Sequence, residues 1–253
     1  MDHKGVTMDN KRQKIRKTTL LISFLLFPVT LFYFSPFLIM WGASLGIITG
    51  SFLTFTALFI LSLFFGRAFC GWACPTGGVQ EYCFSINNEK TRGGKYNWIK
   101  YFLFIPWIAT IAILTLMAGG LTRIDPLFMT KYGVSISEPF IYIIYYGIIF
   151  TTIIIAILAG KRANCHYFCF IAPFMVMGTK IKNLFRWPSL HLKVNKELCV
   201  ECRLCENCPM SLDVKEKVLG GDMHDFECIL CGKCVDSCPK GAIKYSFGNP
   251  KKR

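Results

Sequence analysis

The sequence CILCGKCVDSCP at residues 228–239 determines how the C-terminal part of this 253-residue chain must fold. Its cysteines have the spacing C-x2-C-x2-C-x3-C-P, with which bacterial proteins bind [4Fe–4S] clusters. A second run, CVECRLCENCP at residues 199–209, has two residues instead of three before its fourth cysteine. We therefore predict a small α+β domain of the bacterial two-[4Fe–4S] ferredoxin type over residues 190–248.

The two runs also predict which thiols share a cluster. In two-cluster ferredoxins, the distal cysteine of each run binds the cluster of the other run. The expected ligand sets are Cys199, Cys202, Cys205 and Cys238 for one cluster, and Cys228, Cys231, Cys234 and Cys208 for the other. We leave open whether the short Cys205–Cys208 interval alters the first cluster. Zinc also binds paired C-x2-C motifs, but two runs of four with trailing prolines favour iron–sulfur.

Upstream of this domain the composition indicates an integral membrane protein. The chain is 53% hydrophobic and only 17% charged, whereas soluble domains average about a quarter charged residues. A bilayer-crossing helix needs roughly 20 apolar residues. Four stretches meet this length: Thr18–Met40, Trp41–Gly66, Trp98–Gly119 and Pro139–Gly160. We predict an all-α four-helix transmembrane bundle over residues 18–186, built from two helical hairpin repeats.

Proline and glycine positions suggest further detail within these spans. Pro28, Pro36 and Pro106 are expected to kink their helices. Gly42, Gly46 and Gly50 recur every four residues, a spacing typical of closely packed membrane helices.

The net charge of +14 indicates the topology of the chain. Lysine and arginine are concentrated in residues 1–17, 67–95 and 161–186, whereas the loops of the opposite side contain Arg123 and Lys131. This asymmetry predicts a multi-pass protein of the cell (inner, cytoplasmic) membrane with both termini cytoplasmic, including the basic segments 1–17 and 249–253. Basic residues beside apolar segments favour contact with the lipid bilayer, and no nucleic-acid partner is expected. In a reducing cytoplasm the thirteen cysteines do not indicate a disulfide framework.

Each predicted hairpin is followed by the motif R-A-x-C-x3-C, at residues 67–74 and 162–169. These motifs open two cytoplasmic cysteine loops, 67–83 and 162–175, which can meet on one face of the bundle. Their thiols belong to Cys70, Cys74, Cys165 and Cys169. Three roles remain open for them: an additional iron–sulfur centre at the membrane face, a redox-active thiol group, or simple packing. No haem or flavin site is evident, since the membrane part lacks a histidine pair.

The sequence FCGWACP at residues 69–75, the second C-x3-C motif and the tandem ferredoxin tail resemble the membrane-bound polyferredoxin family. That family includes the quinol-dehydrogenase subunit of periplasmic nitrate reductase and the nitrous-oxide reductase regulator. The resemblance covers roughly residues 18–248 and implies an electron-transfer subunit of an oxidoreductase. It would relay electrons between a quinone pool, or a membrane-face redox centre, and a protein redox partner. An assembly or metal-reductase factor, or a redox-sensing regulator, for a respiratory metalloenzyme is the alternative.

Overall fold

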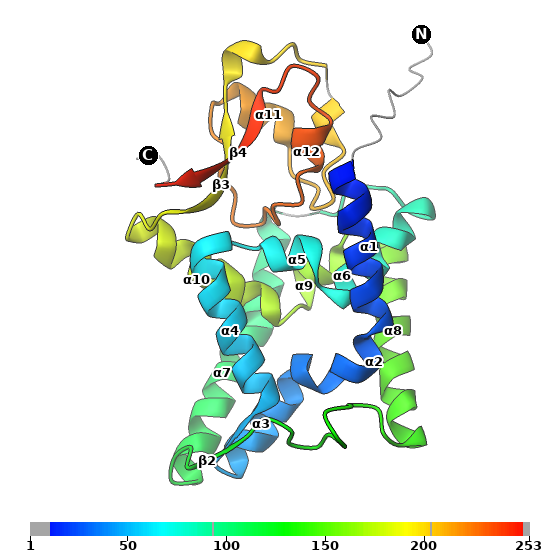
Figure 1. Ribbon diagram of the computed structural model, residues 1–253, viewed down its shortest axis with the longest axis vertical. Helices are drawn as coiled ribbons and strands as arrows, with labels where there is room; N and C mark the ends of the chain where they lie inside the picture. Colours follow the sequence, from blue (N-terminus) through cyan, green and yellow to red (C-terminus); the bar gives the residue numbers. More distant parts are fainter. Residues whose placement is uncertain (1–10, 93, 203, 250–253) are drawn as a thin grey trace.

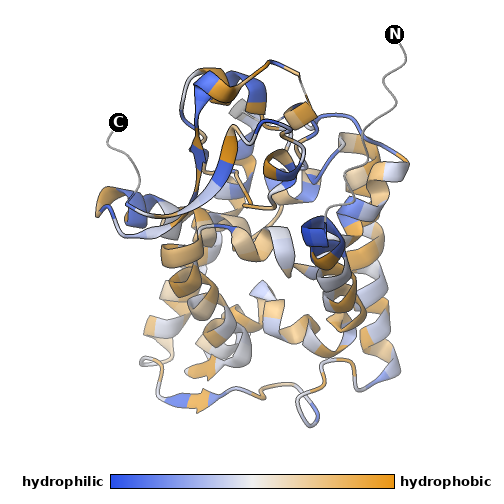
Figure 2. Cartoon of the chain, turned by 45° about the horizontal axis from the view of Figure 1, so that its top comes forward, coloured by the Kyte–Doolittle hydropathy of each residue, from blue (hydrophilic) through white to orange (hydrophobic). Residues whose placement is uncertain are grey.

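The computed structural model describes residues 11–92, 94–202 and 204–249 (Figure 1). Residues 1–10 of the predicted basic N-terminal segment and residues 250–253 of the basic tail lie outside the described residues. Figure 1 shows long helices in the lower part, short helices above them, and the cysteine-rich domain at the top. Hydrophobic residues dominate the lower helices, and hydrophilic residues are more frequent in the upper domain (Figure 2).

Two segments are long and apolar enough to cross a membrane. They are Tyr96–Met117, which includes α7 (Ile99–Met117), and Pro139–Ala159, which is α8. Many of their large apolar side chains are exposed, Phe102 and Phe140 by more than 60% each, as expected for a lipid-facing surface. These segments match the third and fourth predicted spans and point to a membrane location.

The first two predicted spans are not single continuous helices. Residues 11–44 form α1 (Lys11–Leu25), α2 (Phe27–Thr30), the 3-10 helix η1 (Leu31–Phe34) and α3 (Pro36–Ser44). The chain bends by 58° after α1. Pro28 and Pro36 stand at the start of α2 and α3, because proline is tolerated in the first helical turn but not in the interior. The predicted four-helix bundle is therefore not confirmed.

The predicted glycine face is wrong, because a turn and a strand interrupt it. Gly46 adopts a φ of 68° after α3, and Gly50 begins α4 (Gly50–Phe65). Between them β1 (Ile47–Thr49) pairs in parallel with β2 (Arg123–Asp125). α4 is apolar but has 16 residues, so it is shorter than the two candidate spans.

Short helices of the two cysteine loops form the layer above the long helices (Figure 1). The first loop gives α5 (Ala68–Trp72), α6 (Pro75–Tyr82) and the 3-10 helix η2 (Cys83–Ser85), and the 3-10 helix η3 (Gly94–Trp98) precedes α7. The second loop gives α9 (Ala163–Tyr167) and α10 (Ile171–Leu184). α6 packs on α1, and α10 packs on α4. Both repeats thus place the first cysteine of the motif in a short helix and the second between that helix and a longer one.

The C-terminal domain has the predicted α+β composition. β3 (Ser189–Val194) pairs antiparallel with β4 (Ile243–Gly248), with Ser189 opposite Gly248. The segment between them contains the 3-10 helices η4 (Lys196–Leu198) and η5 (Leu204–Glu206), and the helices α11 (Val214–Leu219) and α12 (Lys233–Asp236). Its core consists of Leu192, Val214, Val218, Met223, Leu230 and Ile243.

Candidate metal centres

The eight cysteines of the C-terminal domain line two separate small cavities. Cys199, Cys202, Cys205 and Cys238 line the first cavity. Cys208, Cys228, Cys231 and Cys234 line the second cavity. This grouping has the crossed pattern of two-cluster ferredoxins, and Cys208 reaches the second cavity despite its short interval. That these eight thiols are ligands stays a prediction.

The surroundings of the second cavity suit a cluster better than a single ion. Apolar side chains such as Met210, Leu212 and Ile229 complete its wall. Burial raises the pKa of Cys228 to about 12, so thiolates here need a positively charged partner such as iron. Four thiols around one cavity match the ligand number of a [4Fe–4S] cubane.

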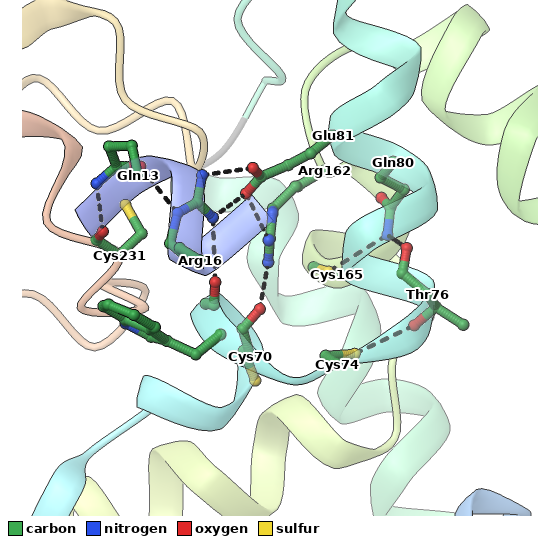
Figure 3. Close-up of polar contacts among 12 residues, drawn as sticks. Gln13, Arg16, Cys70, Cys74, Thr76, Gln80, Glu81, Arg162, Cys165 and Cys231 are labelled. Atoms are coloured by element: carbon green, nitrogen blue, oxygen red, sulfur yellow. Dashed lines mark hydrogen bonds and ion pairs between the residues drawn. The ribbon is translucent and has the colours of Figure 1, made fainter. Parts of the chain in front are cut away.

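The cysteines of the two membrane motifs also come together, and we call Cys70, Cys74, Cys165 and Cys169 the membrane-face thiols. The first three are buried and the fourth is half-buried. Figure 3 shows Cys70 on α5, Cys74 in the turn before α6 and Cys165 on α9 close to one another. Burial, with the neighbouring Cys70 and Cys165, raises the pKa of Cys74 to about 12. Burial, with the neighbouring Cys165, Cys74 and Cys70, also raises the pKa of Cys169, so Cys169 lies within electrostatic reach of the other three thiols.

Two buried arginines flank the membrane-face thiols, one from each repeat. Arg67 and Arg162 begin the two R-A-x-C-x3-C motifs and are 1% and 0% exposed. Arg162 donates to the Cys70 carbonyl oxygen at 2.6 Å, and the charge of Arg67 acts on both Cys70 and Cys165.

Both arginines keep N–H groups without an acceptor. Within the part of the chain that the structure describes, Arg67 Nε and Nη2 and Arg162 Nε are buried and have no hydrogen-bond partner. A buried donor without an acceptor is costly. Sulfur atoms of an anionic iron–sulfur cluster would accept hydrogen bonds from such donors, so this site fits that group.

Two buried carboxylates balance the arginine charges. Glu81 accepts from Arg162 at 2.6 Å and from Arg16 at 2.6 and 2.8 Å (Figure 3). Glu227 accepts from Arg67 at 2.6 Å and from Lys100 at 2.5 Å. Burial alone would raise the pKa of each carboxyl, but Arg162 and Arg16 lower that of Glu81 to about 2. Arg67 and Lys100 likewise lower the pKa of Glu227 to about 2.

Acid is expected to destabilise the protein through these two carboxylates. Their folded-state pKa values lie below the unfolded value of about 4.3, so the folded state binds fewer protons than the unfolded state. Their contribution is fully present above that value and is lost as pH falls toward 2. Urea unfolding between about pH 6 and about pH 3 measures the loss. The double variant Glu81→Gln/Glu227→Gln should show a smaller loss, and an equal loss would contradict this origin.

The membrane-face thiols and the second cavity share one buried region. Cys70, Cys165 and Met175 form a single buried group with Met210, Ile229 and Cys231. Two hydrogen bonds hold the two sides together. Trp72 Nε1 donates to the Leu230 carbonyl at 3.0 Å, and Gln13 Nε2 donates to the Cys231 carbonyl at 2.9 Å. Within the membrane part, Arg16 Nη1 joins α1 to α5 by donating to the Gly71 carbonyl at 3.0 Å.

Sequence reasoning missed the charged residues of this region. It treated Arg16, Arg67 and Arg162 as topology signals, and it assigned no role to Glu81 or Glu227. Two signals were available: an arginine recurs three residues before the first cysteine of both motifs, and Glu81 is the only acidic residue in the loop 67–83.

Comparisons with known proteins agree with this geometry. Residues 47–92 and 143–188 both match the 4Fe-4S binding domain family, and residues 198–243 match the 4Fe-4S dicluster domain family. The chain is 30% identical to the uncharacterized protein MJ0750 of Methanocaldococcus jannaschii over 208 residues, which is 76% of this chain and 77% of that protein. It is 24% identical to the putative electron transport protein YccM of Escherichia coli K12 over 215 residues, 78% of this chain and 56% of YccM.

A third relative is the regulatory protein NosR of Stutzerimonas stutzeri, 26% identical over 204 residues, which is 72% of this chain but 26% of NosR. No solved structure matches the chain. The two separate matches of one cluster-binding domain confirm the internal repeat that the R-A-x-C-x3-C motifs predicted. The chain therefore belongs to the polyferredoxin family of 4Fe–4S electron-transport proteins.

Proposed function

We propose that the chain is a membrane-anchored electron relay with three iron–sulfur centres. Two centres lie in the C-terminal domain, and the membrane-face thiols hold the third. The observation that carries this proposal is the buried group in which Cys70 and Cys165 pack together with Cys231. It puts candidate ligands of two centres in one apolar region, without intervening solvent.

Iron–sulfur clusters supply one-electron transfer when they are bound. The residues of the chain fix the order of the centres. Trp72 and Gln13 hold the second cavity against the membrane-face thiols. Cys202 of the first cavity is exposed, so this end is accessible to a protein redox partner in the cytoplasm. We propose that the relay connects a quinone pool, or the membrane-face centre, with a partner oxidoreductase, and the candidate membrane spans and the electron-transport relatives support this.

Iron counting tests the third centre. In Cys70→Ser/Cys165→Ser, purified without oxygen, iron and acid-labile sulfide are expected to fall by about a third, because one of three cubanes is lost. Cys83→Ser is the matched control, since Cys83 is a buried cysteine of the same loop outside the motif. Unchanged iron in the double variant would reject the third centre and leave a two-cluster protein.

Arg162 is expected to set the reduction potential of the third centre. Reduction adds negative charge beside its buried guanidinium, so Arg162→Gln should make reduction less favourable. We expect the potential of this centre to fall by at least about 60 mV, a tenfold change for one electron. Glu81 keeps Arg16 as its partner in this variant, which limits the damage to the fold.

A redox titration followed by EPR measures this shift. Lys90→Gln is the control, because it removes an equal charge from an exposed pair with Asp213. Equal potentials in Arg162→Gln and the wild type would show that the guanidinium does not act on a redox centre.

A further inference from the structure

A cavity of about 760 Å³ opens where the C-terminal domain meets the end of the apolar helices. The last turn of α10, the strand β3 and the segment 221–226 form its walls. Gly66, directly after α4, and Cys228 also line it. Cavities of this size are typical of sites for cofactors and other small molecules.

Two residues that line this cavity have buried polar atoms without partners. Among the described residues, Ser189 Oγ and Asn183 Oδ1 are buried with no hydrogen-bond partner, and both residues line the cavity. Since buried polar groups are nearly always paired, these atoms leave hydrogen-bonding capacity in the wall of the cavity.

The charge of the lining favours an anion. Lys182, Arg186 and Lys193 line the cavity, and within the described chain none of them forms an ion pair. Lys182 is 5% exposed, and its Nζ donates only to the Leu190 carbonyl, at 3.3 Å. Of the two lining carboxylates, Asp225 is paired with Lys217 at 2.8 Å, and Asp222 accepts from the backbone of His224 at 2.9 Å.

The backbone holds Arg186 at the cavity at a conformational cost. Arg186 follows the end of α10 with a φ of 53°, a conformation that glycine usually supplies at helix ends. The next amide, Trp187 N–H, donates to the Lys182 carbonyl at 2.7 Å. Glycine would close this turn without strain, so an arginine here indicates a use for its charge.

Exposed apolar side chains stand at and after the end of α10, where Leu184 also lines the cavity. Leu184, Phe185 and Trp187 are 77%, 72% and 45% exposed. They stand beside the end of α4, where Phe64 contacts Trp187 with ring centroids 5.6 Å apart. A cationic pocket beside exposed aromatic and aliphatic side chains at the end of an apolar helix suits a ligand with a charged head and an apolar tail.

We propose that this cavity binds the headgroup of an acidic phospholipid. The headgroup phosphate lies between Lys182 and Arg186 and accepts from Ser189, and the acyl chains run along Leu184 and Phe185. The proposal does not depend on the number of iron–sulfur centres. A bound lipid would attach the C-terminal domain to the bilayer, in addition to its covalent link to the membrane part. The site lies next to Cys228, which also lines the cavity.

Lipid binding to the cluster-loaded protein in neutral detergent tests the site, with native mass spectrometry as the readout. Phosphatidylglycerol is expected to bind at a concentration at least about tenfold lower than phosphatidylcholine. Lys182→Gln/Arg186→Gly should lose that preference, and the glycine should relieve backbone strain, so the variant is expected to fold. Lys196→Gln, an exposed lysine outside the cavity, should keep the preference. The visible spectrum of the clusters reports that each variant is intact.

Three outcomes would overturn the proposal. One is equal binding of the two lipids by the wild type, and another is an equal loss of preference in Lys196→Gln. The third is competition by inorganic phosphate or by a short-chain quinone at the concentration at which the lipid binds. Phosphate competition would assign the cavity to a soluble anion, and quinone competition would assign it to a redox substrate.

Discussion

Glu81→Gln is expected to destabilise the protein by about 3–5 kcal/mol, the usual effect of removing one partner from a buried ion pair. Glu81 is the carboxylate shared by Arg16 and Arg162, whose side chains are 1% and 0% exposed. Without it, two buried guanidinium groups face each other without compensation. The loss also reaches the thiols, because Arg162 donates to the Cys70 carbonyl.

Urea unfolding in one detergent, with cluster absorbance and tryptophan fluorescence as separate signals, measures this effect. Glu89→Gln is the matched control, because Glu89 is an exposed acid seven residues from the end of α6; exposed substitutions usually change stability by about 0.5 kcal/mol or less. In Glu81→Gln/Arg162→Gln one of the two uncompensated charges is removed, so part of the stability should return. If Glu81→Gln unfolds at the urea concentration of the control, the buried ion pair is not a determinant of stability.

The sequence was most informative where one short motif predicts both the local fold and the metal ligands. The cysteine spacing predicted which thiols share a cavity, and the R-A-x-C-x3-C motifs predicted the repeat. The spacing within each run or motif is local, since a short loop fixes the distance between neighbouring thiols, and the crossing of Cys208 and Cys238 followed from the two-cluster ferredoxin pattern. The charge network could not be predicted in this way, because Glu81 meets Arg16 and Glu227 meets Arg67 only after distant segments have packed.

Apolar composition predicted the membrane part but not the break in its first span. A hydropathy average does not record where the backbone leaves the helix. Non-helical backbone is tolerated at membrane depth only where other protein groups satisfy it. In η1, which follows the bend, Phe32 N–H donates to Ser135 Oγ at 3.0 Å, and Ser51 Oγ donates to the Phe32 carbonyl. Pro28 and Pro36 predict that the first span is kinked, but both serines come from other parts of the chain, so the span alone does not reveal how its interrupted backbone is satisfied.

Gly71→Ala is expected to separate the C-terminal domain from the membrane-face thiols. A Cβ atom at Gly71 would overlap the carbonyl oxygen of Ile229, and this oxygen belongs to the backbone of the loop before Cys231. Rigid backbone cannot move aside as a flexible side chain can, so the loop must shift as a unit. Such overpacking typically costs about 1–3 kcal/mol. The functional effect should be larger, because the shift would break the Trp72–Leu230 hydrogen bond and open the buried group that joins Cys70 to Cys231.

Hydrogen exchange of residues 226–232 and magnetic coupling between reduced centres in EPR both report on this contact. Gly71→Ala should raise exchange in that loop and weaken the coupling, while its iron content stays that of the wild type. Gly147→Ala is the control, because a Cβ atom at Gly147 of α8 meets no atom within 4 Å; alanine is also the better helix former, by about 1 kcal/mol. Normal coupling in Gly71→Ala would mean that the two sites communicate without this close approach. Loss of coupling with iron retained would show that the contact at Gly71, and not cluster binding alone, joins the membrane part to the ferredoxin domain.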